Sequence, residues 1–181
     1  MRKLAIRASV IVASAATALA FAATSAQADV KPGEIDPVFG APDNGTVSVL
    51  VTKLTHAQAT SRLRDANITW SSSGGCSDRN NPTCTSFSQV NLPTIQGAVT
   101  LKSASNCNLN ITGGTETGHA SGTYSHWNGY KLDYSLSTCL NNWVQNNYSY
   151  IGGNKWEAPS GNIYFRESNH WDVTYYNCGG C

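Results

Sequence analysis

Six cysteines between positions 76 and 181 restrict how this chain can fold. They are Cys76, Cys84, Cys107, Cys139, Cys178 and Cys181. An even number of cysteines in an exported chain favours disulfides, although many pairings are possible. We favour a bond between Cys76 and Cys84, which would close a polar loop, and leave the other pairings open. A structural zinc site at Cys178-Gly-Gly-Cys181 is the weaker alternative, because two thiolates are too few ligands and no second CxxC is present.

The N-terminal segment 1–28 has the layout of a secretory signal peptide. Arg2, Lys3 and Arg7 supply positive charge, residues 8–23 form an apolar run rich in alanine, and residues 26–28 read Ala-Gln-Ala, a typical cleavage site. The apolar run is followed by no stop-transfer pattern, so a membrane anchor is the weaker interpretation. We therefore expect a secreted protein that keeps no membrane anchor once the signal is removed.

The remaining chain divides into a leader and one domain. Residues 29–45 are rich in proline and glycine without an apolar period, which is typical of a flexible leader, and residues 46–181 are long enough to bury a core. The net charge is only +1 and the basic residues form no cluster. Nucleic acid is excluded as a partner, because binding to phosphates needs a concentrated basic surface. We expect a monomer.

Apolar periodicity predicts a small α+β domain that has an antiparallel sheet and two or three helices. Helices are expected at 55–66, 92–105 and 138–146, and strands at 46–51, 67–70, 107–112, 130–136, 162–166 and 170–176. Thr55 and Ser137 are suitable N-caps, and Pro93 suits the first turn of its helix. His56 follows Thr55 and is predicted to lie on the surface.

Two clusters of polar residues could together hold a metal ion. The first reads His126-x-x-Gly129-x-x-x-Asp133, and the second reads Glu167-x-x-His170. Catalytic zinc takes about three ligands from His, Asp, Glu or Cys side chains and leaves one position for water. We therefore predict that His126, Asp133 and His170 bind zinc and that Glu167 acts as the catalytic base.

These paired motifs resemble those of the D-alanyl-D-alanine carboxypeptidase and dipeptidase family of zinc peptidases, to which the Hedgehog signalling domain is structurally related. The resemblance covers about residues 87–176. It implies a small α+β domain with a central antiparallel sheet, zinc bound by His126, Asp133 and His170, and Glu167 as the base. The implied substrates are peptides of bacterial cell walls that contain D-amino acids, such as peptidoglycan stem peptides.

The chain departs from the family pattern at three places. Tyr124 stands where relatives have a serine, and Ser125 is adjacent to the first histidine instead. The arginine that relatives carry before this motif is absent from residues 112–118, and His119 or Arg166 could replace its charge. Some relatives use the second residue of a His-x-His pair as the ligand, so Asp172 is an alternative to His170.

Aromatic residues between the predicted ligands could contact a substrate. Trp127 and Tyr130 lie between His126 and Asp133 in the sequence. Together with His119, Ser125 and Arg166 they complete the predicted substrate-binding set. The competing interpretation of the whole chain is a cell-wall binding or interaction module that keeps the metal and does not cleave.

Overall fold

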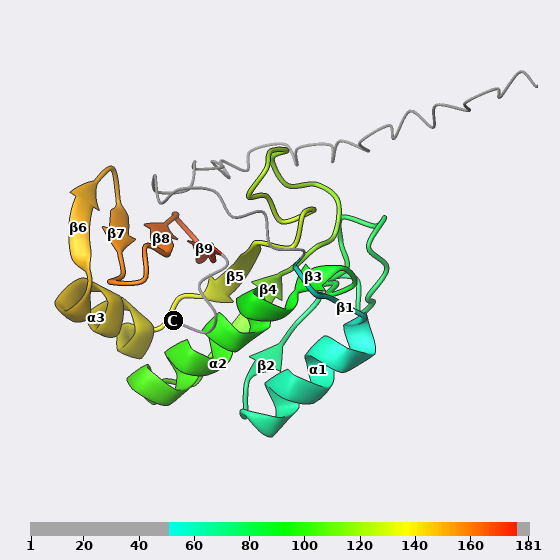
Figure 1. Cartoon of the computed structure of the whole chain (residues 1–181), viewed down its shortest axis with the longest axis horizontal. Coiled ribbons are helices and arrows are strands. Elements are labelled where there is room, and N and C mark those ends of the chain that lie inside the picture. Colours follow the sequence, from blue (N-terminus) through cyan, green and yellow to red (C-terminus); the bar gives the residue numbers. More distant parts are fainter. Residues whose placement is uncertain (1–50, 177–181) are drawn as a thin grey trace, which may run out of the picture.

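The computed structural model describes residues 51–176 of this chain, in which three helices lie on one side of a long sheet (Figure 1). The helices are α1 (His56–Asp65), α2 (Leu92–Ser105) and α3 (Thr138–Asn147). The sheet has seven strands in the order β2-β4-β5-β9-β8-β7-β6, and β1 and β3 form a separate pair. The predicted α+β class is confirmed, and the main sheet is antiparallel except for the parallel pair of β2 and β4.

The strands are short. Their bounds are β1 Lys53–Leu54, β2 Thr69–Trp70, β3 Val90–Asn91, β4 Asn110–Gly113, β5 Lys131–Ser135, β6 Ser149–Gly152, β7 Lys155–Glu157, β8 Ile163–Arg166 and β9 His170–Thr174. The predicted strand 46–51 lies outside the described residues except for Val51, which is not in a strand. The leader, the signal segment and the pair Cys178 and Cys181 also lie outside them. Within residues 51–176, none of the helices has the length and apolar character required to span a bilayer.

The helix ends follow the capping signals in the sequence. The Thr55 hydroxyl accepts a hydrogen bond from the Gln58 N–H at 3.2 Å, and the Gln58 side chain accepts one from the Thr55 N–H at 2.9 Å. Ser137 accepts from the Leu140 N–H at 3.1 Å in the same way. These bonds satisfy backbone donors that the first turn of a helix leaves without an intrahelical partner. The predicted starts of α1 and α3 are therefore confirmed.

His56 does not lie on the surface as predicted. Its side chain is half-buried, stacks on the Phe87 ring at 5.4 Å and accepts a hydrogen bond at Nδ1 from the Phe87 N–H at 3.1 Å. His56 faces the segment around Phe87, whereas Ala57 and Gln58 in the same turn are exposed. The surface prediction for His56 was wrong, because the residues next to His56 in the sequence give no indication of its contact with Phe87.

The central strands β5 and β9 have one apolar face and one polar face. Leu132 pairs with Val173 and Tyr134 with Trp171, and all four side chains are fully buried. The Trp171 indole N–H donates to the side-chain oxygen of Asn141 in α3 at 2.8 Å, so this face packs against the helices. Because side chains alternate along a strand, the intervening residues point to the opposite face.

That opposite face carries polar residues that are nonetheless buried. Asp133 pairs with Asp172 across β5 and β9, and Lys131 pairs with Thr174. The ammonium of Lys131 forms an ion pair with Asp172, and both side chains are fully buried. The long connection between β4 and β5, residues 114–130, lies on this side of the sheet (Figure 1). This connection carries two of the three histidines that meet there.

Two disulfides join distant or irregular segments of the described chain. The predicted bond between Cys76 and Cys84 is present and closes the loop between β2 and β3. A second bond joins Cys107, just before β4, to Cys139 in the first turn of α3. These two bonds fit an extracellular protein, because disulfides persist in oxidising compartments.

Two features escaped the sequence reasoning. Neither the hairpin of β6 and β7 nor the short pair β1 and β3 was predicted. The hairpin turn uses left-handed backbone at Gly152, Gly153 and Asn154, whose φ angles are 89°, 58° and 57°. Glycine and asparagine adopt such angles readily, so the turn signal was present in the sequence.

Candidate metal centre

Asp133 in β5 is the point at which the three histidines of the polar face converge. Its Oδ1 lies 3.2 Å from His126 Nε2 and 3.5 Å from His170 Nε2, and its Oδ2 lies 3.9 Å from His119 Nδ1. All four side chains are buried. The structure thus brings together His126, Asp133 and His170, which come from separate segments of the chain, and adds His119 to them.

Hydrogen bonds fix which ring nitrogen of each imidazole faces Asp133. His126 Nδ1 donates to the Gly114 carbonyl at 2.6 Å, and His170 Nδ1 lies 2.8 Å from Asn169 Oδ1. A neutral imidazole carries one N–H, so Nε2 of each ring is left with its lone pair. Both lone pairs point at a carboxylate oxygen, which is itself an acceptor. This arrangement is stable only if a proton or a metal cation lies between them.

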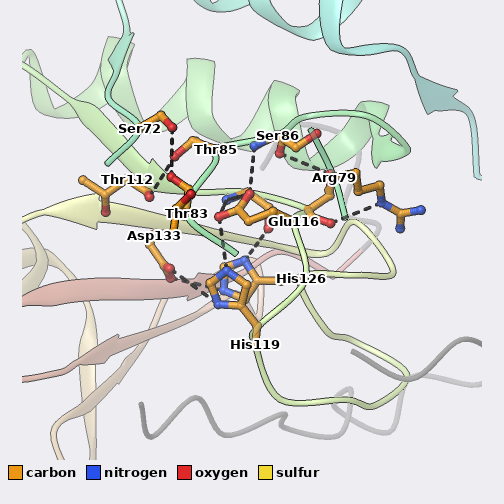
Figure 2. A network of polar contacts seen from close by, with 12 residues as sticks. Ser72, Arg79, Thr83, Thr85, Ser86, Thr112, Glu116, His119, His126 and Asp133 are labelled. Carbon is orange, nitrogen blue, oxygen red and sulfur yellow. Dashed lines mark hydrogen bonds and ion pairs between the residues drawn. The ribbon is translucent and has the colours of Figure 1, made fainter. Parts of the chain in front are cut away.

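His119, His126 and Asp133 form a buried group that could hold a metal ion, since their ligand atoms lie within 4.8 Å of one another. The rings of His119 and His126 are stacked, with centroids 3.8 Å apart and planes 17° apart. Figure 2 shows the two rings between Asp133 on one side and Glu116 on the other. Imidazole and carboxylate donors suit zinc and other first-row transition metals.

The neighbouring imidazoles determine the charge of Asp133. Burial alone would raise the pKa of this carboxyl, but the neighbouring imidazoles, His126 first and then His170 and His119, bring the pKa well below its ordinary value when they carry a proton. A metal cation in place of that proton would keep Asp133 ionised for the same electrostatic reason. Gly113 lies opposite Asp133 in β4, and a Cβ there would lie only 2.2 Å from Asp133 Oδ2. This position admits no side chain while the carboxylate stays where it is.

Glu116 is a second buried carboxylate in this region and was missed by the sequence reasoning. It accepts hydrogen bonds from the Ser86 N–H at 2.8 Å and from the Gly114 N–H at 3.1 Å, and its Oε1 lies 3.3 Å from His119 Nε2. Burial would raise the pKa of Glu116, but His119 and, after it, the backbone N–H groups of Ser86 and of Glu116 itself bring the pKa below its ordinary value. Glu116 stands three residues before His119 in the sequence, and this spacing is too common to identify Glu116 as a site residue.

Glu167, the predicted base, lies beside His170 at the start of β9. Its Oε2 is 3.7 Å from His170 Nε2, and its N–H donates to the His170 carbonyl at 3.0 Å. The carboxylate therefore adjoins the ring nitrogen that also faces Asp133. Asp172, the alternative ligand, instead forms the ion pair with Lys131 on the same face. Of these two candidates, His170 is the one in contact with Asp133.

The predicted substrate-binding residues are distributed unevenly around this centre. Ser125 is buried, and its hydroxyl accepts from the Asn128 N–H at 3.3 Å. Tyr130 is half-buried and meets Tyr124 edge to face at 5.0 Å. Arg166 pairs with a core residue of β9 and thus points to the helix side, so the structure does not bring its guanidinium to Asp133.

Two cations that the sequence reasoning did not single out hold the connection around His126. The Arg79 guanidinium stacks on the Trp127 ring at 3.7 Å and donates to the Trp127 carbonyl. It also donates to the Thr115 carbonyl at 3.2 Å (Figure 2). The Lys53 ammonium donates to the next carbonyl, that of Asn128. Burial and the charge of Arg79 lower the pKa of Lys53 to about 8. Both cations come from segments far away in the sequence.

Comparison with other proteins finds no counterpart. No protein-family model, no curated protein and no solved structure matches this chain. The interpretation of the metal centre therefore depends on the geometry described above and on the motif residues His126, Asp133, Glu167 and His170.

Proposed function

We propose that this protein is an exported zinc peptidase in which His126, Asp133 and His170 would hold the ion. One observation carries the proposal: two imidazoles direct their lone-pair nitrogens at the same oxygen of Asp133, at 3.2 and 3.5 Å. In addition, neither Asp133 Oδ1 nor His170 Nε2 forms a hydrogen bond within the described part of the chain, although both are buried. A cation would satisfy both atoms.

The separations between Asp133 and the imidazoles of His126 and His170 suit one zinc ion. Ligands at about 2.0 to 2.1 Å from a tetrahedral zinc are separated from each other by about 3.3 Å. The contacts of Asp133 with His126 and His170 lie close to this separation. Calcium and magnesium are disfavoured, because they prefer a shell of oxygen ligands over imidazoles.

Glu167 would move the proton during hydrolysis. When bound, zinc would act as a Lewis acid that polarises a substrate carbonyl and makes water acidic near neutral pH. The Glu167 carboxylate adjoins His170 at 3.7 Å and can take a proton from water and return it to the leaving amine. Its side chain is only 9 % exposed, so it would act on water within the centre.

The proposed substrates are cell-wall peptides that contain D-amino acids, as the motif resemblance implies. Such peptides end in a carboxylate, which requires a cation near the metal. Arg79, already stacked on Trp127 next to His126, is better placed for this purpose than Arg166, which points to the helix side. Trp127 and Tyr130 would line the same edge. Export and the disulfides agree with a substrate outside the cell.

Metal analysis of the purified chain tests the metal centre. We expect about one zinc per chain and strong loss of binding for Asp133→Asn, because the amide removes the negative charge of the ligand. If wild type binds no zinc at stoichiometric concentration, the proposal is wrong.

Peptide hydrolysis tests the reaction separately. Wild type should release D-alanine from D-Ala-terminated stem peptides, and Glu167→Gln should lower kcat by about 10² to 10⁴ while zinc stays bound. Glu157→Gln, a half-buried carboxylate in β7, is the matched control and should behave as wild type. Equal rates for wild type and Glu167→Gln would exclude the proposed base. Zinc binding without hydrolysis by either protein would favour the non-catalytic cell-wall module.

A further inference from the structure

We propose that Glu116 is a positioning residue of the metal centre and that His119 is its intermediary, supporting His126 without binding the ion itself. This inference rests on the proposed metal site and assigns roles to two residues outside its ligand set. Neither residue is needed to complete that set, yet both are buried against it.

Glu116 is held more firmly than an ordinary side chain. Its carboxylate is fully buried and receives the N–H groups of Ser86 and Gly114, which belong to two different segments. Burying a carboxylate is unfavourable unless several donors compensate it. The chain has thus provided a fixed negative group directly behind the stacked imidazoles of His119 and His126.

The first connection from Glu116 to His126 runs through the backbone of Gly114. Glu116 fixes the N–H of Gly114 at 3.1 Å, and the carbonyl of the same residue accepts the hydrogen bond from His126 Nδ1 at 2.6 Å. A Cβ at Gly114 would lie only 2.0 Å from the Ser86 carbonyl oxygen, so this backbone is packed tightly against its neighbour. The carbonyl that orients His126 is consequently placed by Glu116.

The second connection runs through the ring of His119. Its Nε2 faces Glu116 Oε1 at 3.3 Å, and its ring lies against the face of His126 at 3.8 Å. An imidazole binds a metal ion in the plane of its ring. Two rings stacked with planes only 17° apart cannot both direct their lone pairs at one ion. His119 therefore fills the face of His126 and prevents that ring from turning.

This assignment makes the centre a site of two imidazoles and one carboxylate, in which one coordination position remains for substrate or water. If His119 were a third imidazole ligand, the protein donors alone would complete a tetrahedral shell. Such closed shells are typical of structural zinc. The role of His119 thus decides between an open and a closed centre.

Glu116→Gln tests the positioning role. The glutamine oxygen can still accept from Ser86 and Gly114, but its amide would face His119 Nε2 with a hydrogen-bond donor and without charge. We expect zinc to bind about 10 to 100 times more weakly, measured by competition with a chromophoric chelator, while the urea midpoint of the metal-free protein stays near that of wild type. Glu157→Gln is the matched control and should keep the affinity of wild type. Equal zinc affinity in folded Glu116→Gln and wild type would overturn the proposal.

Cobalt-substituted wild type tests the role of His119 without any variant. Each imidazole bound to Co²⁺ through one nitrogen gives one strongly shifted, solvent-exchangeable N–H signal in the proton NMR spectrum. We expect signals from His126 and His170 only; a third such signal would show that His119 is a ligand and would refute its supporting role. This measurement stands even if Glu116→Gln does not fold. Absence of metal binding by wild type would instead refute the metal site itself.

Discussion

Gly113→Ala should separate metal binding from folding. Gly113 lies opposite Asp133 in the sheet, and an added Cβ would lie 2.2 Å from Oδ2 and 2.9 Å from Cγ of that carboxylate. Carbon and oxygen atoms that are not bonded stay more than about 3 Å apart, so the carboxylate must move by about 1 Å. Metal sites tolerate shifts of about 0.2 Å in ligand distance. The displacement is thus about five times the tolerance.

We expect this displacement to weaken zinc binding by about 100-fold, which corresponds to about 2.7 kcal/mol. Stability without metal should fall by about 1 to 3 kcal/mol, because the carboxylate that must move is buried, although Gly113 is not among the described residues with positive φ. The affinity is therefore measured on the folded variant, which separates the two losses. Chelator competition measures the affinity, and urea unfolding of the metal-free protein measures the stability.

The control is Thr112→Ala in the same strand, whose side chain is exposed and points away from Asp133. It should leave zinc affinity unchanged. If Gly113→Ala binds zinc as tightly as wild type and remains folded, Asp133 is not a ligand and the assignment of the centre fails.

Three further predictions concern the stability of the fold. Removing the Cys107–Cys139 bond by a double alanine substitution should lower the free energy of unfolding by about 3.5 to 4 kcal/mol, because its ends are separated by 32 residues. An unchanged urea midpoint would show that the bond does not constrain the unfolded chain. Gly97→Ala in α2 should lower the free energy of unfolding by about 1 to 3 kcal/mol, because the added Cβ would lie 2.4 Å from the Tyr175 ring. This cost should exceed the gain from the better helix propensity of alanine, and a rise in the melting temperature would contradict this packing. Burial and the charge of Arg64 lower the pKa of His56 in the folded protein. The contribution of neutral His56 to the free energy of unfolding is therefore fully present above the unfolded-state pKa of about 6.5, and it is lost as the pH falls toward the folded-state pKa. Between pH 7.5 and pH 5, the free energy of unfolding measured with urea should therefore fall less for His56→Asn than for wild type. Equal falls would show that His56 does not contribute to the pH dependence of stability.

Much of the local structure could be predicted because its signals lie within a few residues of each other. The helix α2 has the predicted bounds, with Pro93 in its first turn. The strand at 170–176 was also predicted, and the alternation of side chains along it puts His170 and Asp172 on one face and the buried Trp171 on the other. The hairpin of β6 and β7 was missed because its strands are short and a glycine-rich turn is also compatible with an open loop.

The candidate site could be predicted only in part. The motif residues His126, Asp133, Glu167 and His170 were named in advance, and the fold brings them into one region. His119 was expected to contact substrate, whereas its ring lies buried against His126. Its participation could not be inferred from spacing, because the irregular connection between β4 and β5 follows no periodic pattern.

The amino-acid sequence by itself determined which residues begin helices, which side chains of a strand share a face and which residue types could bind a metal. These properties depend on neighbours along the chain and on the alternation of side chains. Only the tertiary structure decided that Asp172 pairs with Lys131, that Arg79 reaches Trp127 and that Glu116 stands behind His119. Each of these contacts depends on how the sheet and its connecting segments pack together in space, which residue spacing does not encode.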